Sequence, residues 1–168
     1  MDRLIIMRHA KAERASASGR DFDRALSPRG LAQALAMGEA LAERRLRPDR
    51  VLVSSAARTR GTWQAMTPLF PDAVASEDEA LYNAPASRWR ARIEAAMAQP
   101  GTLLVIGHNP GIHELALELL EEGAGPASAG ARLSEGFPTA ALCVFGVDAA
   151  ERFTFEGHFT PRSLGIEP

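Results

Sequence analysis

The chain has 168 residues, of which 46% are hydrophobic and 24% are charged, a balance typical of a folded protein rather than a disordered one. Its formal net charge is −2, so no overall positive field favours nucleic acid or an anionic membrane, and any anion site must be local. This length predicts one domain over residues 1–168, with a substantial core.

The chain has neither a long apolar segment nor a set of cysteines. No stretch approaches the roughly 18 apolar residues of a membrane span, and the short apolar run at the N-terminus predicts no secretory signal. The single cysteine, Cys143, excludes an internal disulfide framework, so we expect a cytoplasmic protein. Cys143 and the isolated aromatic residues Trp63, Tyr82 and Trp89 are expected to pack in the core.

The first elements of the chain are predicted from an apolar run and a helix start signal. Residues 4–7 are continuously apolar, as in a strand covered on both faces, whereas 12–26 follow no period and predict a loop. A helix is predicted over about 28–45, where apolar residues recur at helical spacing. Ser27 is its expected N-cap, and Pro28 takes the first helical position.

The rest of the chain repeats this alternation. Continuous apolar runs at 51–53 and 102–106 predict two more buried strands. Weaker patterns predict helices at 57–69, at 86–98 and in a segment ending near 122, and strands at 73–76, 140–147 and 152–159. The segment 123–138, rich in Gly, Ala and Ser, is predicted to be a loop or lid, and the tail to be coil.

Strands that alternate with helices in this way predict a three-layer α/β/α sandwich with a mostly parallel central sheet. Ligands of such sheets bind at the carboxyl ends of the strands, where the strand order switches. The three strong strands are followed by Arg8-His9, by Ser54-Ser55 with Arg58 just beyond, and by Gly107-His108. If these strands are neighbours, two histidines and two arginines meet at one edge.

This set of residues suits a phosphoryl group. Arg8 and Arg58 offer planar forks of donors for phosphate oxygens, and Gly107 allows close approach of the backbone. The segment that begins with Asn109 opens a helix whose N-terminal amides favour an anion. One neutral imidazole can attack phosphorus while the other donates to the phosphoryl oxygens, so this chemistry requires no metal.

A metal centre is the obvious alternative, because the chain contains four histidines: His9, His108, His113 and His158. His108 and His113 are five residues apart, and there is no HExxH pattern. The carboxylates do not accompany the histidines at the spacing of a metal site. We therefore expect no metal and no cofactor.

Four segments resemble motifs of the histidine phosphatase superfamily, the phosphoglycerate mutase-like proteins. They are MRHAKAE at 7–13, DFDRALSPRG at 21–30, VLVSSAARTRGT at 51–62 and VIGHNPGIHELA at 105–116. The order and spacing match from residue 3 to about 120. The small size, the GHNPG segment and the D-x-x-R-x-L-S-P-R-G segment are most similar to phosphohistidine phosphatases of the SixA type.

The resemblance implies a phosphoglycerate mutase-like fold and a role for each matching residue. His9 would be the nucleophile that becomes phosphorylated, and Arg8, Arg58 and His108 would form the phosphate pocket, with His108 as a donor. Gly107 and Asn109 are the expected substrate-binding residues beside it, and Arg24 falls in a segment that approaches the substrate.

The sequence departs from the family pattern at two points. Ala10 replaces the glycine that usually follows the nucleophile, and as the smallest alternative it should preserve the pocket. Members that cleave esters carry a carboxylate general acid in the middle of the chain, for which the candidate here is Glu79, beside Glu77 and Asp78. The SixA type lacks this acid, which an imidazole leaving group tolerates.

These features predict a metal-independent phosphatase that acts on protein phosphohistidine through a phosphohistidine intermediate on His9. Two alternatives stay open: a phosphatase of small phosphate monoesters, and a module that binds phosphoproteins with little turnover. A mutase is less favoured, because nothing marks a site that would retain a phosphoglycerate intermediate. Neither nucleic acid nor a membrane is an expected partner.

Overall fold

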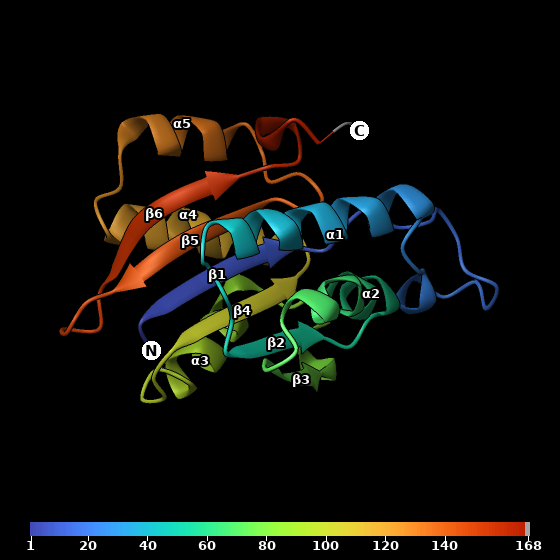
Figure 1. The fold of residues 1–168 in the computed structure, drawn as a ribbon, viewed down its shortest axis with the longest axis horizontal. Coiled ribbons are helices and arrows are strands. Elements are labelled where there is room, and N and C mark those ends of the chain that lie inside the picture. The colour runs from blue at the N-terminus through green and yellow to red at the C-terminus, as the bar shows by residue number, and fades with distance from the viewer. Residues whose placement is uncertain (167–168) are drawn as a thin grey trace.

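The computed structural model describes residues 1–166, in which strands and helices alternate along most of the chain (Figure 1). The strands are β1 (Arg3–Arg8), β2 (Arg50–Ser54), β3 (Val74–Asp78), β4 (Thr102–Gly107), β5 (Leu142–Val147) and β6 (Phe153–Phe159). The helices are α1 (Pro28–Glu43), α2 (Ala57–Met66), α3 (Ala86–Ala95), α4 (Gly111–Glu122) and α5 (Ala127–Ser134). Short 3-10 turns occupy Asp21–Asp23, Thr67–Leu69, Glu79–Leu81 and Arg162–Leu164.

The strands form one sheet in the order β3-β2-β4-β1-β5-β6, so β1 is central. β1, β2, β3 and β4 are mutually parallel, whereas β5 runs antiparallel to β1, and β6 antiparallel to β5. The mostly parallel sheet predicted from the sequence is confirmed. The register pairs Arg8 with Gly107, and the two residues that follow them, His9 and His108, therefore leave the sheet side by side.

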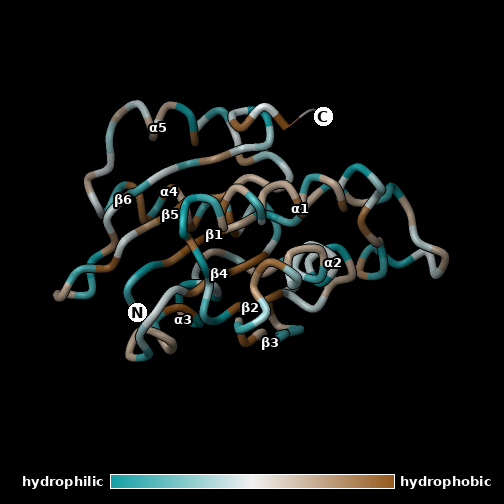
Figure 2. The backbone as a smooth tube through the Cα atoms, viewed as in Figure 1, coloured by the Kyte–Doolittle hydropathy of each residue, from teal (hydrophilic) through white to brown (hydrophobic). Residues whose placement is uncertain are grey.

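Helices cover both faces of the sheet, as the alternation of elements predicts. In Figure 1, α1 and α2 lie in front of the sheet, and α3 and α4 lie behind it. Hydrophobic residues are concentrated along the central strands (Figure 2), and Leu4, Ile5, Ile6 and Met7 are fully buried. β1 is apolar on both faces because alternate side chains enter two different cores.

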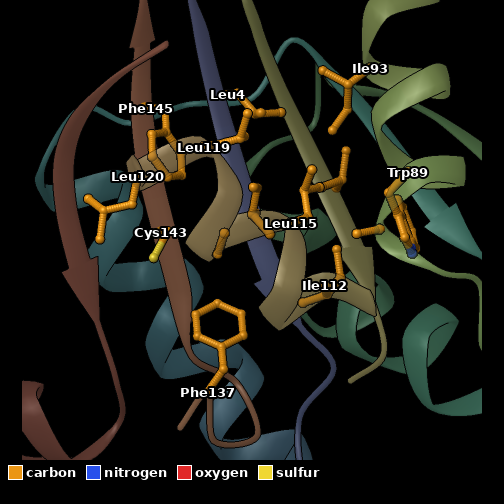
Figure 3. Packing of buried hydrophobic residues seen from close by; sticks show 14 of the residues in the cluster. Leu4, Trp89, Ile93, Ile112, Leu115, Leu119, Leu120, Phe137, Cys143 and Phe145 are labelled. Atoms are coloured by element: carbon orange, nitrogen blue, oxygen red, sulfur yellow. The ribbon is translucent and has the colours of Figure 1, made fainter. Parts of the chain in front are cut away.

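One core packs α3, α4 and α5 against the sheet (Figure 3). Trp89 and Ile93 from α3 and Leu115 and Leu119 from α4 meet alternate residues of the strands there. The other core packs α1 and α2 against the opposite face. The predictions for Cys143, Trp63 and Trp89 are confirmed, since all are buried, and burial raises the pKa of the Cys143 thiol. Tyr82 does not follow the prediction, because it is only half-buried.

The start of α1 follows the predicted capping pattern. Ser27 Oγ accepts a hydrogen bond from the backbone of Gly30 at 3.1 Å, and Pro28 begins the helix. The helix ends at Glu43, slightly before the expected position. The predicted helix 57–69 is split by Pro68 into α2 and a 3-10 turn, because proline cannot donate the next helical hydrogen bond.

The segment 123–138 is not the loop that its composition predicts, since it contains α5. Ala129 and Leu133 of this helix are fully buried, and their spacing of four residues places them on one face. The composition rich in Gly, Ala and Ser, from which a loop was predicted, therefore does not prevent a short amphipathic helix here. The predicted coil of the tail contains the turn Arg162–Leu164, and residues 167–168 lie outside the described part of the chain. Over residues 1–166, no helix has the length and hydrophobicity needed to cross a membrane.

Candidate active site

Three of the predicted site residues meet at the carboxyl ends of β1, β2 and β4. His9 follows β1, and its backbone N–H donates to the Gly107 carbonyl at 3.0 Å, which holds it beside His108. The two imidazole rings lie 5.4 Å apart between centroids. Arg58 comes from the first turn of α2, directly after β2. His9, Arg58 and His108 are 7%, 3% and 3% exposed, so the sheet edge holds a buried cationic pocket.

The environment of His9 favours a nucleophilic imidazole. Its Nδ1 lies 2.7 Å from the Ala10 carbonyl, which can only accept, so Nδ1 carries the proton and Nε2 keeps a lone pair. Burial lowers the pKa of His9 to about 4, against the opposite effect of the Ala10 hydrogen bond, and the charges of Arg58 and Arg8 lower it further. His9 is therefore neutral near pH 7.

His108 is also an uncharged imidazole in the unliganded pocket. Its Nε2 lies 2.6 Å from Ser54 Oγ, and its Nδ1 is buried without a hydrogen-bond partner within residues 1–166. Burial, followed by the charge of Arg58, lowers the pKa of His108 to about 3. When the Ser54 hydroxyl donates to Nε2, the proton of the ring resides on Nδ1, which is then free to donate to a ligand.

Arg8 and Arg58 each keep one donor without a partner among the described residues. One terminal nitrogen of Arg8 donates to the Phe137 carbonyl at 3.0 Å, and Arg58 donates to the backbone oxygen of Asp21 at 2.9 Å. The Nε–H groups of both arginines are buried with no partner among the described residues. Burial and the neighbouring Arg58 charge lower the pKa of Arg8. An anion with several acceptor oxygens would satisfy these donors and reduce the repulsion between the two cations.

Asp21 organises the outer side of the pocket. Its carboxylate accepts from Arg24 Nε at 2.8 Å, from Arg58 at 3.1 Å and from the Tyr82 hydroxyl. The Tyr82 hydrogen bond is the largest cause that lowers the pKa of Asp21 to about 2, with smaller contributions from Arg24 and Arg58. The Tyr82 ring also packs edge-on against His108, with centroids 5.6 Å apart.

Sequence reasoning missed Asp21 and Tyr82 as parts of this site. The D-x-x-R pattern that ends in Arg24 contained the available signal for Asp21. For Tyr82 the signal was its place in the same central segment as Glu79. Arg24 itself lies beside the pocket, joined to Arg58 through Asp21, and a second bond to the Glu13 carbonyl at 2.8 Å holds it there.

Two residues of the family-like motifs hold the loop that follows His9. Thr62 Oγ1 accepts from the backbone of Ala10 at 3.0 Å and donates to the Arg58 carbonyl at 2.7 Å, so α2 is tied to the residue that follows His9. A Cβ on Gly30 would lie 1.9 Å from the Lys11 carbonyl oxygen, and only glycine allows α1 to begin so close to this loop. These contacts fix the backbone on either side of the pocket.

The remaining predicted residues lie in different surroundings. A Cβ on Gly107 would lie 2.4 Å from Trp89, so packing on the core side requires glycine there. The Asn109 side chain donates at 2.9 Å to the Phe137 carbonyl, the same acceptor that Arg8 uses. Ligand contacts of Gly107 and Asn109 stay predictions. Glu79 is exposed, and within residues 1–166 its carboxylate makes no hydrogen bond or ion pair with a residue of the pocket, although its backbone carbonyl accepts from the Tyr82 N–H at 3.1 Å. Its role as a general acid also stays a prediction.

The arrangement of possible metal ligands can be compared with the metal centre that the four histidines offered as an alternative. Nowhere in residues 1–166 do three His, Cys, Asp or Glu side chains come together in a group that could hold a metal ion. The pocket residues that surround His9 are cationic rather than anionic, and they match the chemistry of an oxyanion.

The strand-end motifs that resemble those of histidine phosphatases thus bring two histidines and two arginines to one edge of the sheet. The model of the histidine phosphatase superfamily (branch 1) matches residues 4–102, and the chain belongs to this family of phosphatases. Its curated relatives include the uncharacterized protein Rv1276c of Mycobacterium tuberculosis, which is 36% identical over 141 residues, 84% of this chain and 87% of that protein.

Solved structures of SixA proteins are similar to this chain over nearly its whole length. The SixA protein of Agrobacterium tumefaciens, named as a phosphohistidine phosphatase, is 33% identical, with a TM-score of 0.83 over 95% of this chain and 98% of that one. The protein of the same name from Nakamurella multipartitia is 29% identical, with a TM-score of 0.81 over 95% of this chain and 96% of that one. The predicted SixA-like, phosphoglycerate mutase-like fold is confirmed.

Proposed function

We propose that this phosphatase removes phosphoryl groups from histidine side chains of a protein partner, with a phosphohistidine intermediate on His9. The observation that carries the proposal is the state of His9. It is buried and neutral, and its Nδ1 proton is directed to the Ala10 carbonyl, so Nε2 is left as the nucleophile. The names of the SixA neighbours support the substrate class.

In the first step, Nε2 of His9 attacks phosphorus while the bond from phosphorus to the substrate nitrogen breaks. Arg8 and Arg58, whose positive charges act on His9, would hold the phosphoryl oxygens, and His108 would add a third donor. The substrate imidazole leaves and takes a proton from solvent. Water then attacks phosphorus, the bond to Nε2 breaks, and inorganic phosphate is released with restored His9.

The carboxylate beside the pocket supports a substrate whose leaving group needs no protonation by the enzyme. Asp21 is the carboxylate that the hydrogen-bond network places there, and its pKa of about 2 keeps it ionised at neutral pH. The Tyr82 proton points to Asp21, and this hydrogen bond raises the pKa of Tyr82. An imidazole can leave without an enzymatic acid, whereas an alkoxide of a small phosphate ester cannot do so readily.

The test is to trap the intermediate. The enzyme is mixed with a protein that carries radioactive phosphohistidine, denatured in alkali within one turnover, and separated by size. We expect a label on the enzyme that is stable in alkali and lost in acid, as a phosphorus–nitrogen bond requires. His9→Ala should remove the label, and His113→Ala, a histidine outside the phosphate pocket, should retain it.

The same reactions distinguish the alternatives. Dephosphorylation of a small aryl phosphate together with inactivity on phosphohistidine proteins would replace the proposed substrate with a small monoester. A label that survives acid, or one that persists in His9→Ala, would contradict the intermediate. Equal rates for wild type and His9→Ala would instead favour a module that only binds phosphoproteins.

A further inference from the structure

A second cavity adjoins the phosphate pocket on the side of β6. It has a volume of about 950 Å³, and residues from α4, α5, the end of β6 and the following turn line it. Arg8 connects the two places, because it precedes His9 at the end of β1 and also lines this cavity, and Asn109, the residue after His108, lines the cavity too. Further out, its wall carries Arg44, Arg132, His113 and His158, and we call this space the cationic cavity.

Phe137 fixes the wall between the two spaces. Its carbonyl accepts from Arg8 at 3.0 Å and from Asn109 at 2.9 Å. Its ring is 2% exposed and stacks between two imidazoles, with centroids 5.9 Å from His113 and 5.8 Å from His158. Figure 3 shows Phe137 close to the arrowhead of β1, the strand that leads to His9. The cationic cavity is therefore built against the catalytic residues and is not a separate surface hollow.

The charges of the cavity are uncompensated within the described residues. Arg8, Arg44 and Arg132 line it together with one carboxylate, Glu135. Neither Arg44 nor Arg132 takes part in an ion pair within residues 1–166, whereas arginines such as Arg3, Arg90 and Arg152 do. Because acidic residues outnumber basic ones in the whole chain, this gathering of cations is a local feature.

Arg132 makes the fewest contacts within the protein among the cations of this cavity. Arg44 donates to the Ala40 carbonyl at the end of α1 and packs over the ring of Phe159. No side-chain hydrogen bond of Arg132 is found within residues 1–166, and it is exposed at the last turn of α5. It nevertheless lies close to the imidazoles, since burial, then Arg132 and then His113 lower the pKa of His158. The Nε2 atom of His158 is buried and has no partner there either.

We infer that the cationic cavity docks an acidic side chain that neighbours the phosphohistidine on the partner protein. This inference rests on the proposed function. Because Arg8 lies next to His9 and also lines the cavity, a residue close to the phosphohistidine in the partner can enter the cavity while the phosphohistidine occupies the phosphate pocket. A carboxylate there would meet Arg132, whose positive charge complements its own, beside the rings of His113 and His158.

Two synthetic peptides test this inference. Both carry one phosphohistidine, and they differ only in having Glu or Gln at the flanking positions. For the wild type we expect kcat/KM about tenfold higher on the Glu peptide, the size of one charge-assisted contact, with the difference in KM. Arg132→Gln should abolish this preference, and Arg132→Lys should retain most of it. Arg152→Gln, whose ion pair with Asp148 lies elsewhere, should leave it unchanged.

The rate on an aryl phosphate, which has no second anionic group, separates docking from a structural role. Arg132→Gln should turn over this compound at the wild-type rate. Equal kcat/KM for the two peptides in the wild type would overturn the inference and leave the proposed function intact. An equal loss on aryl phosphate and peptide in Arg132→Gln would also overturn it. If neither peptide is dephosphorylated while the aryl phosphate is, the proposed function fails first and the inference falls with it.

Discussion

Arg58 in the phosphate pocket and Arg132 in the cationic cavity are cations on the same side of the molecule, but their surroundings differ. Arg58 is 3% exposed, and two of its donors are held by Asp21. Arg132 is exposed and makes no ion pair within residues 1–166. An arginine that is already ordered loses little conformational freedom when a ligand binds, whereas a free one must be ordered at that moment.

This difference indicates a division of tasks. The phosphate pocket is desolvated and pre-ordered, which is what stabilisation of charge in a transition state requires. The cationic cavity is open and adaptable, which suits recognition of a variable neighbour rather than chemistry. Substitutions in the pocket should therefore act mainly on kcat, and substitutions in the cavity mainly on KM.

The largest effect should come from Arg58→Ala. We expect kcat on an aryl phosphate to fall by about a thousandfold, because a preorganised charge on the transferred group is lost. Arg58→Lys should recover little, since an ammonium cannot reproduce the planar fork. The matched control is Arg60→Ala, an exposed arginine of the same helix, which should keep the wild-type rate. A fall in kcat of less than tenfold in Arg58→Ala would contradict the division between a catalytic Arg58 and a docking Arg132.

A smaller effect should follow from Asp21→Asn. Asp21 is a positioning residue that holds Arg58 and Arg24, and we expect kcat to fall about tenfold when these side chains are freed. The substitution also removes a negative charge beside the pocket. Inorganic phosphate should therefore inhibit the variant with an inhibition constant equal to or lower than that of the wild type. Steady-state kinetics with phosphate as inhibitor measures both quantities.

The control for Asp21→Asn is Asp23→Asn. Asp23 belongs to the same 3-10 turn, but its partners are Ser18 and the exposed Arg20. The Asp23→Asn substitution should therefore leave kcat unchanged. Weaker phosphate inhibition in Asp21→Asn, with unchanged kcat, would assign Asp21 to ground-state binding instead.

The pH dependence of kcat/KM should show little acid loss over the range in which an ordinary histidine titrates. His9 must be neutral to attack, and its pKa of about 4 keeps it so at pH 5 and above. On an aryl phosphate, after correction for substrate ionisation, the acid limb should therefore lie near pH 4. A limb centred near the ordinary histidine value of about 6.5 would show that the pocket is more hydrated than its burial indicates.

The same depressed pKa values predict a loss of stability in acid. Between about 4 and the unfolded value of about 6.5, the unfolded chain binds more protons at His9 than the folded chain does. Stability is thus full above the unfolded pKa and falls as pH decreases through this window. Urea unfolding should show it, and His9→Asn should show a shallower dependence. A pH-independent urea midpoint would contradict the burial of a neutral imidazole.

The sequence predicted the phosphate pocket in detail because the pocket depends on local rules. Continuous apolar runs mark buried parallel strands, and residues after such strands share one edge of the sheet. The meeting of Arg8, His9 and His108 at one edge was predicted in this way, and the register of β1 and β4 brings the two histidines side by side, while their roles stay predictions. The strand-end rule needs no knowledge of side-chain packing.

The features that the sequence did not predict depend on contacts between distant segments. Asp21 and Tyr82 meet across 61 residues, and neither lies at the end of a strongly apolar strand. The helix α5 is amphipathic and buries Ala129 and Leu133, although the Gly, Ala and Ser residues around them have the composition of a loop. The cationic cavity is lined by residues that lie far apart in the chain, from α4, α5 and β6, so no local pattern predicts it.

The smallest effect should come from Ala10→Gly, which restores the residue that usually follows the family's nucleophile. Ala10 is fully buried and packs in the core with residues such as Met7 and Leu26, while its backbone N–H is held by Thr62. Its methyl group thus belongs to the core, and we expect kcat within twofold of wild type. Loss of buried packing and added freedom of the unfolded chain should reduce stability by about 1 kcal/mol. Urea unfolding beside aryl phosphate kinetics measures both. A large gain in kcat would instead place the Ala10 methyl group against the substrate and mark this departure as a restraint on the reaction.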